Sequence, residues 1–129
     1  MAALLLDTHI FVWIRTAPEI LVAAERRALD SAAPRFISAI SIWEIAILAS
    51  RGRIAADERL FVLPQGLELL PVLPEHCKEL LQLPHHHRDP FDRMLIAQAR
   101  VEGLSLTTRD RAIAAYRSTG LSILPRGTR

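Results

Sequence analysis

The chain has 129 residues, of which half are hydrophobic and 23% are charged, and its formal net charge is +2. A chain of this length forms one domain with a real core, and its composition is too apolar for a disordered protein. Its apolar runs are shorter than the roughly 18 residues of a membrane span. Met1–Asp7 lacks the basic residues of a signal peptide, and the single Cys77 excludes an internal disulfide. We therefore expect one cytoplasmic domain over residues 1–129 and no membrane partner.

Apolar periodicity and helix-boundary residues predict strands and helices that alternate along the chain. The predicted strands are Ala2–Leu6, Arg35–Ser38, Leu67–Val72, Leu104–Thr107 and Leu121–Leu124. The predicted helices are Thr8–Arg15, Pro18–Ser31, Ser41–Arg51, Pro74–Leu83, Pro90–Gly103 and Asp110–Tyr116. The first strand is apolar throughout, as in a parallel strand covered on both faces. This order predicts an α/β fold, a three-layer α/β/α sandwich with a parallel sheet of about five strands.

Four carboxylates follow a predicted strand or open a predicted helix. They are Asp7, Glu44, Asp92 and Asp110. Because the carboxyl ends of parallel strands line one crevice, residues far apart in sequence can converge there. Converging carboxylates repel one another by a few kcal/mol at an effective dielectric constant of about 20, and a hard cation removes that cost. The pattern predicts a site for Mg²⁺ or Mn²⁺, which prefer carboxylate oxygens.

Each of these acids also has an ordinary structural explanation. Asp7 fits a turn at a strand end, and Glu44 fits the N3 position of a capping box that Ser41 begins. Asp92 fits the first turn of a helix, where the helix dipole favours an anion, and Asp110 fits an N-cap. The placement of all four at one edge of a sheet favours the metal site.

Four sequence motifs resemble those of PIN-domain ribonucleases. They are Leu5-Leu6-Asp7-Thr8, Ser41-Ile42-Trp43-Glu44-Ile45, Arg88-Asp89-Pro90-Phe91-Asp92-Arg93-Met94-Leu95-Ile96-Ala97-Gln98-Ala99 and Leu106-Thr107-Thr108-Arg109-Asp110. The motifs occur in the family's order and are most similar to those of the VapC-type toxins of toxin–antitoxin pairs. The resemblance implies a PIN-like fold and a Mg²⁺- or Mn²⁺-dependent endoribonuclease that hydrolyses RNA phosphodiester bonds. It also implies a cognate antitoxin protein as a partner.

The resemblance places the catalytic and metal-binding positions of the family on the four acids. Asp7 and Asp92 are expected to bind the metal directly, and Glu44 and Asp110 to complete its surroundings directly or through water. A bound metal ion would lower the pKa of a water molecule to make an attacking hydroxide, and a metal ion would also stabilise the leaving oxygen. No His or Lys nucleophile is required.

Hydroxyl and arginine side chains beside these acids are candidates for substrate binding. Thr8 and Thr108 are interpreted as positioning water or a phosphate oxygen, although a hydroxyl beside a helix start also serves as a cap. If a cation neutralises the four acids, the remaining 16 basic and 10 acidic residues leave a net charge of +6, which suits a phosphate backbone. Arg93 and Arg100 share one helical face, and we expect them to bind RNA unless they are simply solvated.

Two further sets of residues have less specific interpretations. His85-His86-His87 is a poor zinc site, because three consecutive His do not share a face of a helix or strand. We interpret it as a solvated loop. If these histidines have a functional role, we expect it to be contact with RNA. Asp89 precedes Pro90 and is interpreted as the cap of the helix that Pro90 starts.

The predicted helix that begins at Ser41 has almost no polar face. Ile42, Trp43, Ile47 and Leu48 lie on several of its sides, and a helix that is apolar all round needs cover on every side. We expect a homodimer, an antitoxin segment or both to supply that cover. The competing account is a central helix that the chain itself covers. The competing function is a non-catalytic RNA- or protein-binding module on a PIN-like fold, against which the presence of all four acids argues.

Overall fold

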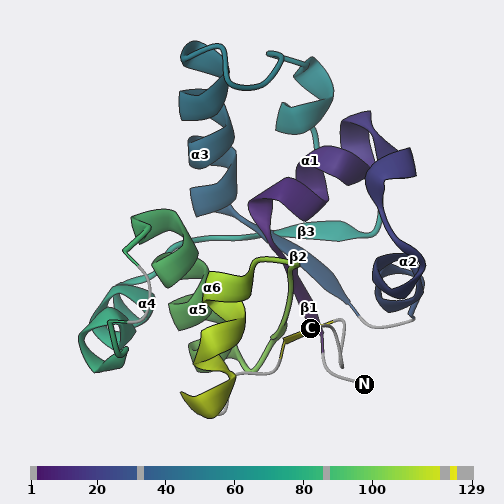
Figure 1. The fold of residues 1–129 in the computed structure, drawn as a ribbon. Coiled ribbons are helices and arrows are strands. Elements are labelled where there is room, and N and C mark those ends of the chain that lie inside the picture. Colours follow the sequence, from purple (N-terminus) through teal and green to yellow (C-terminus); the bar gives the residue numbers. More distant parts are fainter. Residues whose placement is uncertain (1–2, 32–33, 86–87, 120–122, 125–129) are drawn as a thin grey trace.

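The computed structural model describes residues 3–31, 34–85, 88–119 and 123–124. Within these residues, parallel strands form a 5-stranded sheet in the order β3-β2-β1-β4-β5 (Figure 1). The strands are β1 (Leu4–Leu6), β2 (Arg35–Ser38), β3 (Leu67–Leu70), β4 (Ser105–Thr107) and β5 (Ile123–Leu124). The α-helices are α1 (Thr8–Thr16), α2 (Ala23–Leu29), α3 (Ala39–Ser50), α4 (Pro74–Glu79), α5 (Pro90–Glu102) and α6 (Arg111–Ala114). Short 3₁₀ helices are η1 (Pro18–Ile20), η2 (Glu58–Phe61), η3 (Leu80–Gln82) and η4 (Ala115–Thr119). The predicted parallel α/β fold is confirmed.

The sheet separates two hydrophobic cores. Leu5 of the central strand pairs with Phe36 on one side and Leu106 on the other, and it packs on the face that α5 and α6 cover. Leu4 and Leu6 point to the opposite face, where α1, α2 and η2 pack. This alternation follows from the two-residue period of a strand. The result is the three-layer sandwich that the sequence predicts.

Two of the predicted helices are broken into shorter pieces. The segment predicted as one helix from Pro18 forms η1 and then α2, because Leu21 and Val22 adopt extended backbone angles between them. The segment predicted from Pro74 to Leu83 forms α4 and then η3. Among the described residues, no helix combines the length and the apolar character that crossing a membrane requires.

Helix α3 begins earlier than the sequence predicts. Ser38 ends β2 with extended angles, and its Oγ accepts a hydrogen bond of 3.0 Å from the backbone amide of Ile40, so Ser38 is the N-cap. The predicted capping box of Ser41 and Glu44 is therefore wrong, since a suitable cap residue already stands at the strand end. Ser41 lies in the first turn and Glu44 in the second, and starting the helix does not explain Glu44.

Helices α5 and α6 begin as the sequence predicts. The Asp89 carboxylate accepts hydrogen bonds from the backbone amides of Phe91 at 2.9 Å and Asp92 at 3.2 Å, and Pro90 occupies the first turn. Asp110 caps α6 by accepting a hydrogen bond of 2.8 Å from the amide of Ala112. The interpretation of Asp89 and Asp110 as N-caps is confirmed.

Gly103 ends α5 in a left-handed conformation and yields a stability prediction. Its φ is +69°, and a Cβ at this position would meet no other atom within 4 Å. We expect Gly103→Ala to lower the free energy of unfolding by about 1 kcal/mol through backbone strain alone. Gly103→Asn should lower it less, since Asn tolerates this conformation. Urea unfolding of both variants measures the difference, and an unchanged Ala variant would contradict the explanation.

Candidate functional site

Asp7 lies at the carboxyl end of β1, next to the end of β4. Its backbone amide donates a hydrogen bond of 2.9 Å to the carbonyl of Thr107. The Thr108 hydroxyl donates to Asp7 Oδ2 at 2.8 Å, and Asp7 is only 6% exposed. Parallel pairing of β1 with β4 thus brings together two side chains that are 101 positions apart in the sequence.

Glu44 reaches the same region from α3. The Thr8 hydroxyl donates a hydrogen bond of 2.7 Å to Glu44 Oε1, and Thr8 Oγ1 lies 2.8 Å from Ser41 Oγ. All three side chains are buried. Because Thr8 directly follows Asp7, the start of α1 holds both acids at one place. Sequence reasoning missed Ser41 as part of this site, although its position one turn before Glu44 signals a shared face.

Asp92 and Asp110 lie at the starts of the two neighbouring helices. Asp92 occupies the first turn of α5 and is 8% exposed. Asp110 is the N-cap of α6, and its backbone amide donates a hydrogen bond of 3.0 Å to Thr108 Oγ1. The Thr108 hydroxyl therefore connects Asp7 with the start of α6. Helices α3 and α5, which carry Glu44 and Asp92, pack against each other.

Burial raises the pKa of the Asp7 carboxyl above its ordinary value. The hydrogen bond from Thr108 and the charge of His9 oppose this rise, and the charge of Asp110 adds to it. Asp7 and Asp110 therefore repel each other in the folded protein.

Burial likewise raises the pKa of the Glu44 carboxyl. The hydrogen bond from Thr8 lowers this pKa, whereas the negative charges of Asp89 and Asp7 raise it further. Two acids from separate parts of the chain thus act on Glu44. These interactions show that Asp7, Glu44 and Asp110 share one electrostatic environment, with Asp89 beside it.

No arginine or lysine balances Asp7 or Glu44 within the described part of the chain. The ion pairs between described residues involve other acids, which are Asp57, Glu79, Glu102 and Glu25. The hydrogen-bond donors on Asp7 and Glu44 are neutral hydroxyls instead. The site therefore concentrates negative charge at low exposure.

The donors of this site are carboxylate and hydroxyl oxygens, which hard divalent cations prefer. Within the described ranges, no group of three or more His, Cys, Asp or Glu side chains is placed to hold a metal ion by itself. Mg²⁺ keeps several waters and needs only one or two protein carboxylates. A carboxylate has about four lone-pair positions, so the hydroxyl bonds on Asp7 and Glu44, with the backbone hydrogen bond from Thr8 to Asp7, do not fill the oxygen positions of either acid among the described residues. The chemistry of these donors fits such an ion.

The two arginines predicted to bind RNA have partners within the chain. Arg93 donates hydrogen bonds to the carbonyls of Pro84 at 2.9 Å and Leu80 at 3.3 Å, and to the Tyr116 hydroxyl at 3.1 Å. Arg100 donates to Glu79 at 2.8 Å and is half-buried. These contacts tie α5 to the segment from α4 to Pro84. RNA binding by Arg93 and Arg100 stays a prediction.

The histidine run is only partly described. His85 is exposed, whereas His86 and His87 lie outside the described residues. No zinc-like cluster involving His85 occurs among the residues that the structure covers.

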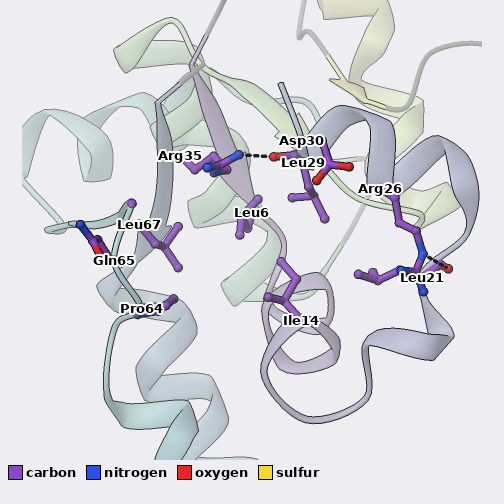
Figure 2. Close-up of a pocket in the computed structure, with 11 residues that line it drawn as sticks. Leu6, Ile14, Leu21, Arg26, Leu29, Asp30, Arg35, Pro64, Gln65 and Leu67 are labelled. Carbon is purple, nitrogen blue, oxygen red and sulfur yellow. Dashed lines mark hydrogen bonds between the residues drawn. The ribbon is translucent and has the colours of Figure 1, made fainter. Parts of the chain in front are cut away.

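A cavity of about 390 Å³ lies away from the acids, between α1, α2 and the segment before β3 (Figure 2). Its lining residues are Leu6, Ile14, Leu21, Arg26, Leu29, Asp30, Arg35, Pro64, Gln65, Gly66 and Leu67. The guanidinium of Arg26 donates to the carbonyl of Leu21 at 3.2 Å, and that of Arg35 donates to the carbonyl of Leu29. These two cations thus bond to backbone oxygens of the chain, and the cavity is separate from the acidic site.

The sequence and fold of this chain match a known family. The model of the PIN domain matches residues 4–118, a range that includes all four candidate site acids. The chain belongs to the PIN-domain family. Ribonuclease VapC22 of Mycobacterium tuberculosis is 30% identical over 122 residues, which are 91% of this chain and 94% of that protein. This similarity groups the chain with the VapC-type members of the family.

Solved structures of PIN-fold toxins have the same fold. A chain in the VapBC2 structure from Rickettsia felis, bound to a promoter DNA fragment, has a TM-score of 0.71 and 17% identity, and the match covers 94% of this chain and 96% of that one. The DNA-bound VapBC of Salmonella typhimurium has a TM-score of 0.64 and 24% identity, covering 95% and 97% of the two chains. VapC20 of Mycobacterium tuberculosis, described as a sarcin-ricin loop cleaving toxin, has a TM-score of 0.64 and 16% identity, covering 88% and 94%.

The raised pKa of Asp7 predicts how a neutral replacement changes stability with pH. The unfolded chain loses the Asp7 proton near pH 3.8, whereas the folded protein loses it at higher pH, so the folded state becomes less stable as pH rises through the folded pKa. Without metal, Asp7→Asn should therefore be at least as stable as the unmodified protein at pH 7. The difference in stability between the two proteins should disappear below about pH 4, where the Asp7 carboxyl is protonated in both the folded and the unfolded state.

Thermal unfolding in chelator at several pH values measures this difference. Glu68→Gln is a matched control, because Glu68 is exposed on the edge strand β3, which β2 separates from β1. A melting temperature of Asp7→Asn well below that of the unmodified protein at pH 7 would show that the Asp7 charge stabilises the fold.

Proposed function

We propose that this protein is a Mg²⁺- or Mn²⁺-dependent endoribonuclease and the toxin of a toxin–antitoxin pair, acting in the cytoplasm as one domain over residues 1–129. The observation that carries the proposal is the meeting of Asp7 and Glu44, both buried and bonded to neutral hydroxyls, beside the charges of Asp110 and Asp89. Membership of the PIN-domain family and the similarity to a protein named as a ribonuclease support it.

The acids have separate parts in the proposed reaction. Asp7 and Asp92 would hold the cation directly, and Glu44 and Asp110 would complete its surroundings directly or through water. When bound, the metal lowers the pKa of a water molecule and stabilises the leaving oxygen. The closeness of several carboxylates makes the site selective for a cation, because it is repulsive without one.

The two threonines orient carboxylates in this proposal. A hydroxyl carries a single proton, and Thr108 donates its proton to Asp7 while accepting a hydrogen bond from the amide of Asp110. Thr8 donates to Glu44 in the same way. Each threonine thereby fixes one acid in a defined direction. In this proposal the hydroxyls do not position water or phosphate directly. They act through the acids that they orient.

A cognate antitoxin is the proposed protein partner. The similar structures from Rickettsia felis and Salmonella typhimurium are of VapBC assemblies.

We also propose a homodimer, for which the C-terminal half of α3 is the candidate surface. Ile47 and Leu48 are half-buried there and Ala46 is exposed, so the chain does not cover this helix on all sides. The competing account of a fully covered central helix is wrong for the described chain.

Removal of single site charges tests the proposed catalysis. Asp7→Asn and Asp92→Asn should each lower the RNA cleavage rate by more than about 100-fold, because loss of outer groups around a metal alone costs about 10- to 100-fold. Both variants should remain folded, since Asn can still accept the Thr108 hydrogen bond at position 7. Cleavage of a labelled structured RNA with Mg²⁺ or Mn²⁺ gives the rates.

Two control variants sharpen this test. Glu68→Gln removes an exposed charge outside the site and should leave cleavage unchanged. Asp89→Asn keeps a good N-cap while removing the charge, so it should retain most activity if Asp89 only caps α5. Equal cleavage by the unmodified protein and both site variants, after contaminating nuclease is excluded, would contradict the assignment. RNA binding without any cleavage would favour a binding module.

A further inference from the structure

Trp43 is an exposed aromatic residue on α3, the helix that carries Glu44. It directly precedes Glu44 in α3, and it is 59% exposed. Other exposed large hydrophobic residues in the described chain lie on other elements, namely Ile20, Val22, Phe61, Val62, Leu69, Leu73 and Leu81. On the helices that carry site acids, Trp43 is the one described large hydrophobic side chain that is mainly open to solvent.

Phe91 holds the Trp43 ring in a defined orientation. The two ring centroids lie 5.5 Å apart, and the ring planes make an angle of 71°, which is an edge contact. Phe91 directly precedes Asp92 in α5 and is half-buried. The aromatic pair therefore bridges α3 and α5, the two packed helices that carry Glu44 and Asp92. Because Trp43 is 59% exposed, much of the indole surface remains open to solvent beside this contact.

Trp43 lies in the N-terminal half of α3, nearer to Glu44 along the helix than the proposed dimer surface at Ala46, Ile47 and Leu48. A single oriented ring beside a phosphodiester-cleaving site matches the aromatic platforms on which unpaired nucleic-acid bases stack.

We propose that Trp43 stacks on an unpaired base of the RNA substrate next to the scissile phosphate. The proposal rests on the proposed ribonuclease function and specifies the substrate as RNA that is single-stranded or unpaired at the cleavage point. Stacking places the neighbouring phosphate against Glu44 and Asp92 on the two helices that the aromatic pair joins. Recognition of this kind is tolerant of sequence, because every base has a flat face.

A comparison of two probes measures the contribution of the base. One probe is a fluorescein-labelled oligoadenylate of about twelve nucleotides, and the other has the same length and a ribose-phosphate backbone without bases. With chelator present to prevent cleavage, the unmodified protein should bind oligoadenylate about 5- to 150-fold more tightly than the abasic probe, which is the range for one stacked base. Trp43→Ala should lose most of this preference and Trp43→Phe should keep most of it.

Phe61→Ala is the matched control. Phe61 is also an exposed aromatic residue, at 47%, but it lies on η2, which carries none of the site acids. This variant should keep the full preference for oligoadenylate. In cleavage assays with metal, Trp43→Ala should raise KM by a similar factor and change kcat less, since stacking acts on substrate binding.

Tryptophan fluorescence gives a direct signal of the contact. The chain has 2 tryptophans, and Trp13→Phe leaves Trp43 as the single reporter. Oligoadenylate should quench this emission and the abasic probe should not. Trp13 lies beneath Arg109, at 4.2 Å from the guanidinium carbon to the ring centroid, and the phenyl ring of Phe preserves an aromatic partner there.

The outcomes separate this proposal from the function on which it rests. If the unmodified protein cleaves RNA but Trp43→Ala keeps its base preference, the Trp43 proposal fails and the ribonuclease function stands. If the Trp43-dependent preference is present without cleavage, base stacking on Trp43 stands, whereas the ribonuclease function and the placement beside a scissile phosphate fail. A protein without preference for oligoadenylate overturns the proposal. An unchanged preference in Trp43→Ala with loss of a dimer in light scattering assigns Trp43 to a protein contact and also overturns it.

Discussion

The main constraint on this molecule is a pair of buried carboxylates that accept hydrogen bonds from neutral hydroxyls. Asp7 and Glu44 each accept a hydrogen bond from a threonine, and burial together with neighbouring acids raises the pKa of both. Among the described residues no arginine or lysine forms an ion pair with either acid, and burial of a carboxylate that lacks such a partner costs stability. The cation that we propose for this site would remove that cost.

The sheet order makes the arrangement possible. The central strand β1 pairs with both β2 and β4, so the residue after β1 lies between the segments that follow its two neighbours. Asp7 and Thr108 meet because of this register. Glu44 lies one turn into α3, which starts where β2 ends. Asp92 lies in the first turn of α5. The hydrophobic cores on both faces hold these helix starts in place, and the chemistry of the site depends on their packing.

The alternating order of elements and the caps of α5 and α6 could be predicted because they depend on local features, such as apolar runs, Pro90 and acids with suitable spacing. The start of α3 could not be predicted with the same rules, since Ser38 and Ser41 are both acceptable caps and strand pairing decides between them. The partners of Arg93 lie in distant segments, so its sequence position suggested a solvent-exposed cation. The four acids were predicted from their positions at strand ends and helix starts and from motif order, and their assignment stays a prediction, whereas the hydroxyl contacts to Asp7 and Glu44 required the fold.

The central claim is that acids from four separate segments form one cation site. Titration of the metal-free protein with Mn²⁺, followed by the electron paramagnetic resonance signal of free Mn²⁺, tests it most directly. Neutral variants of Asp7, Glu44, Asp92 and Asp110 should each weaken the same Mn²⁺ binding event by about tenfold or more, while Glu68→Gln leaves it unchanged. Mn²⁺ binding that is absent from the unmodified protein, or that persists unaltered in these variants, would contradict the account.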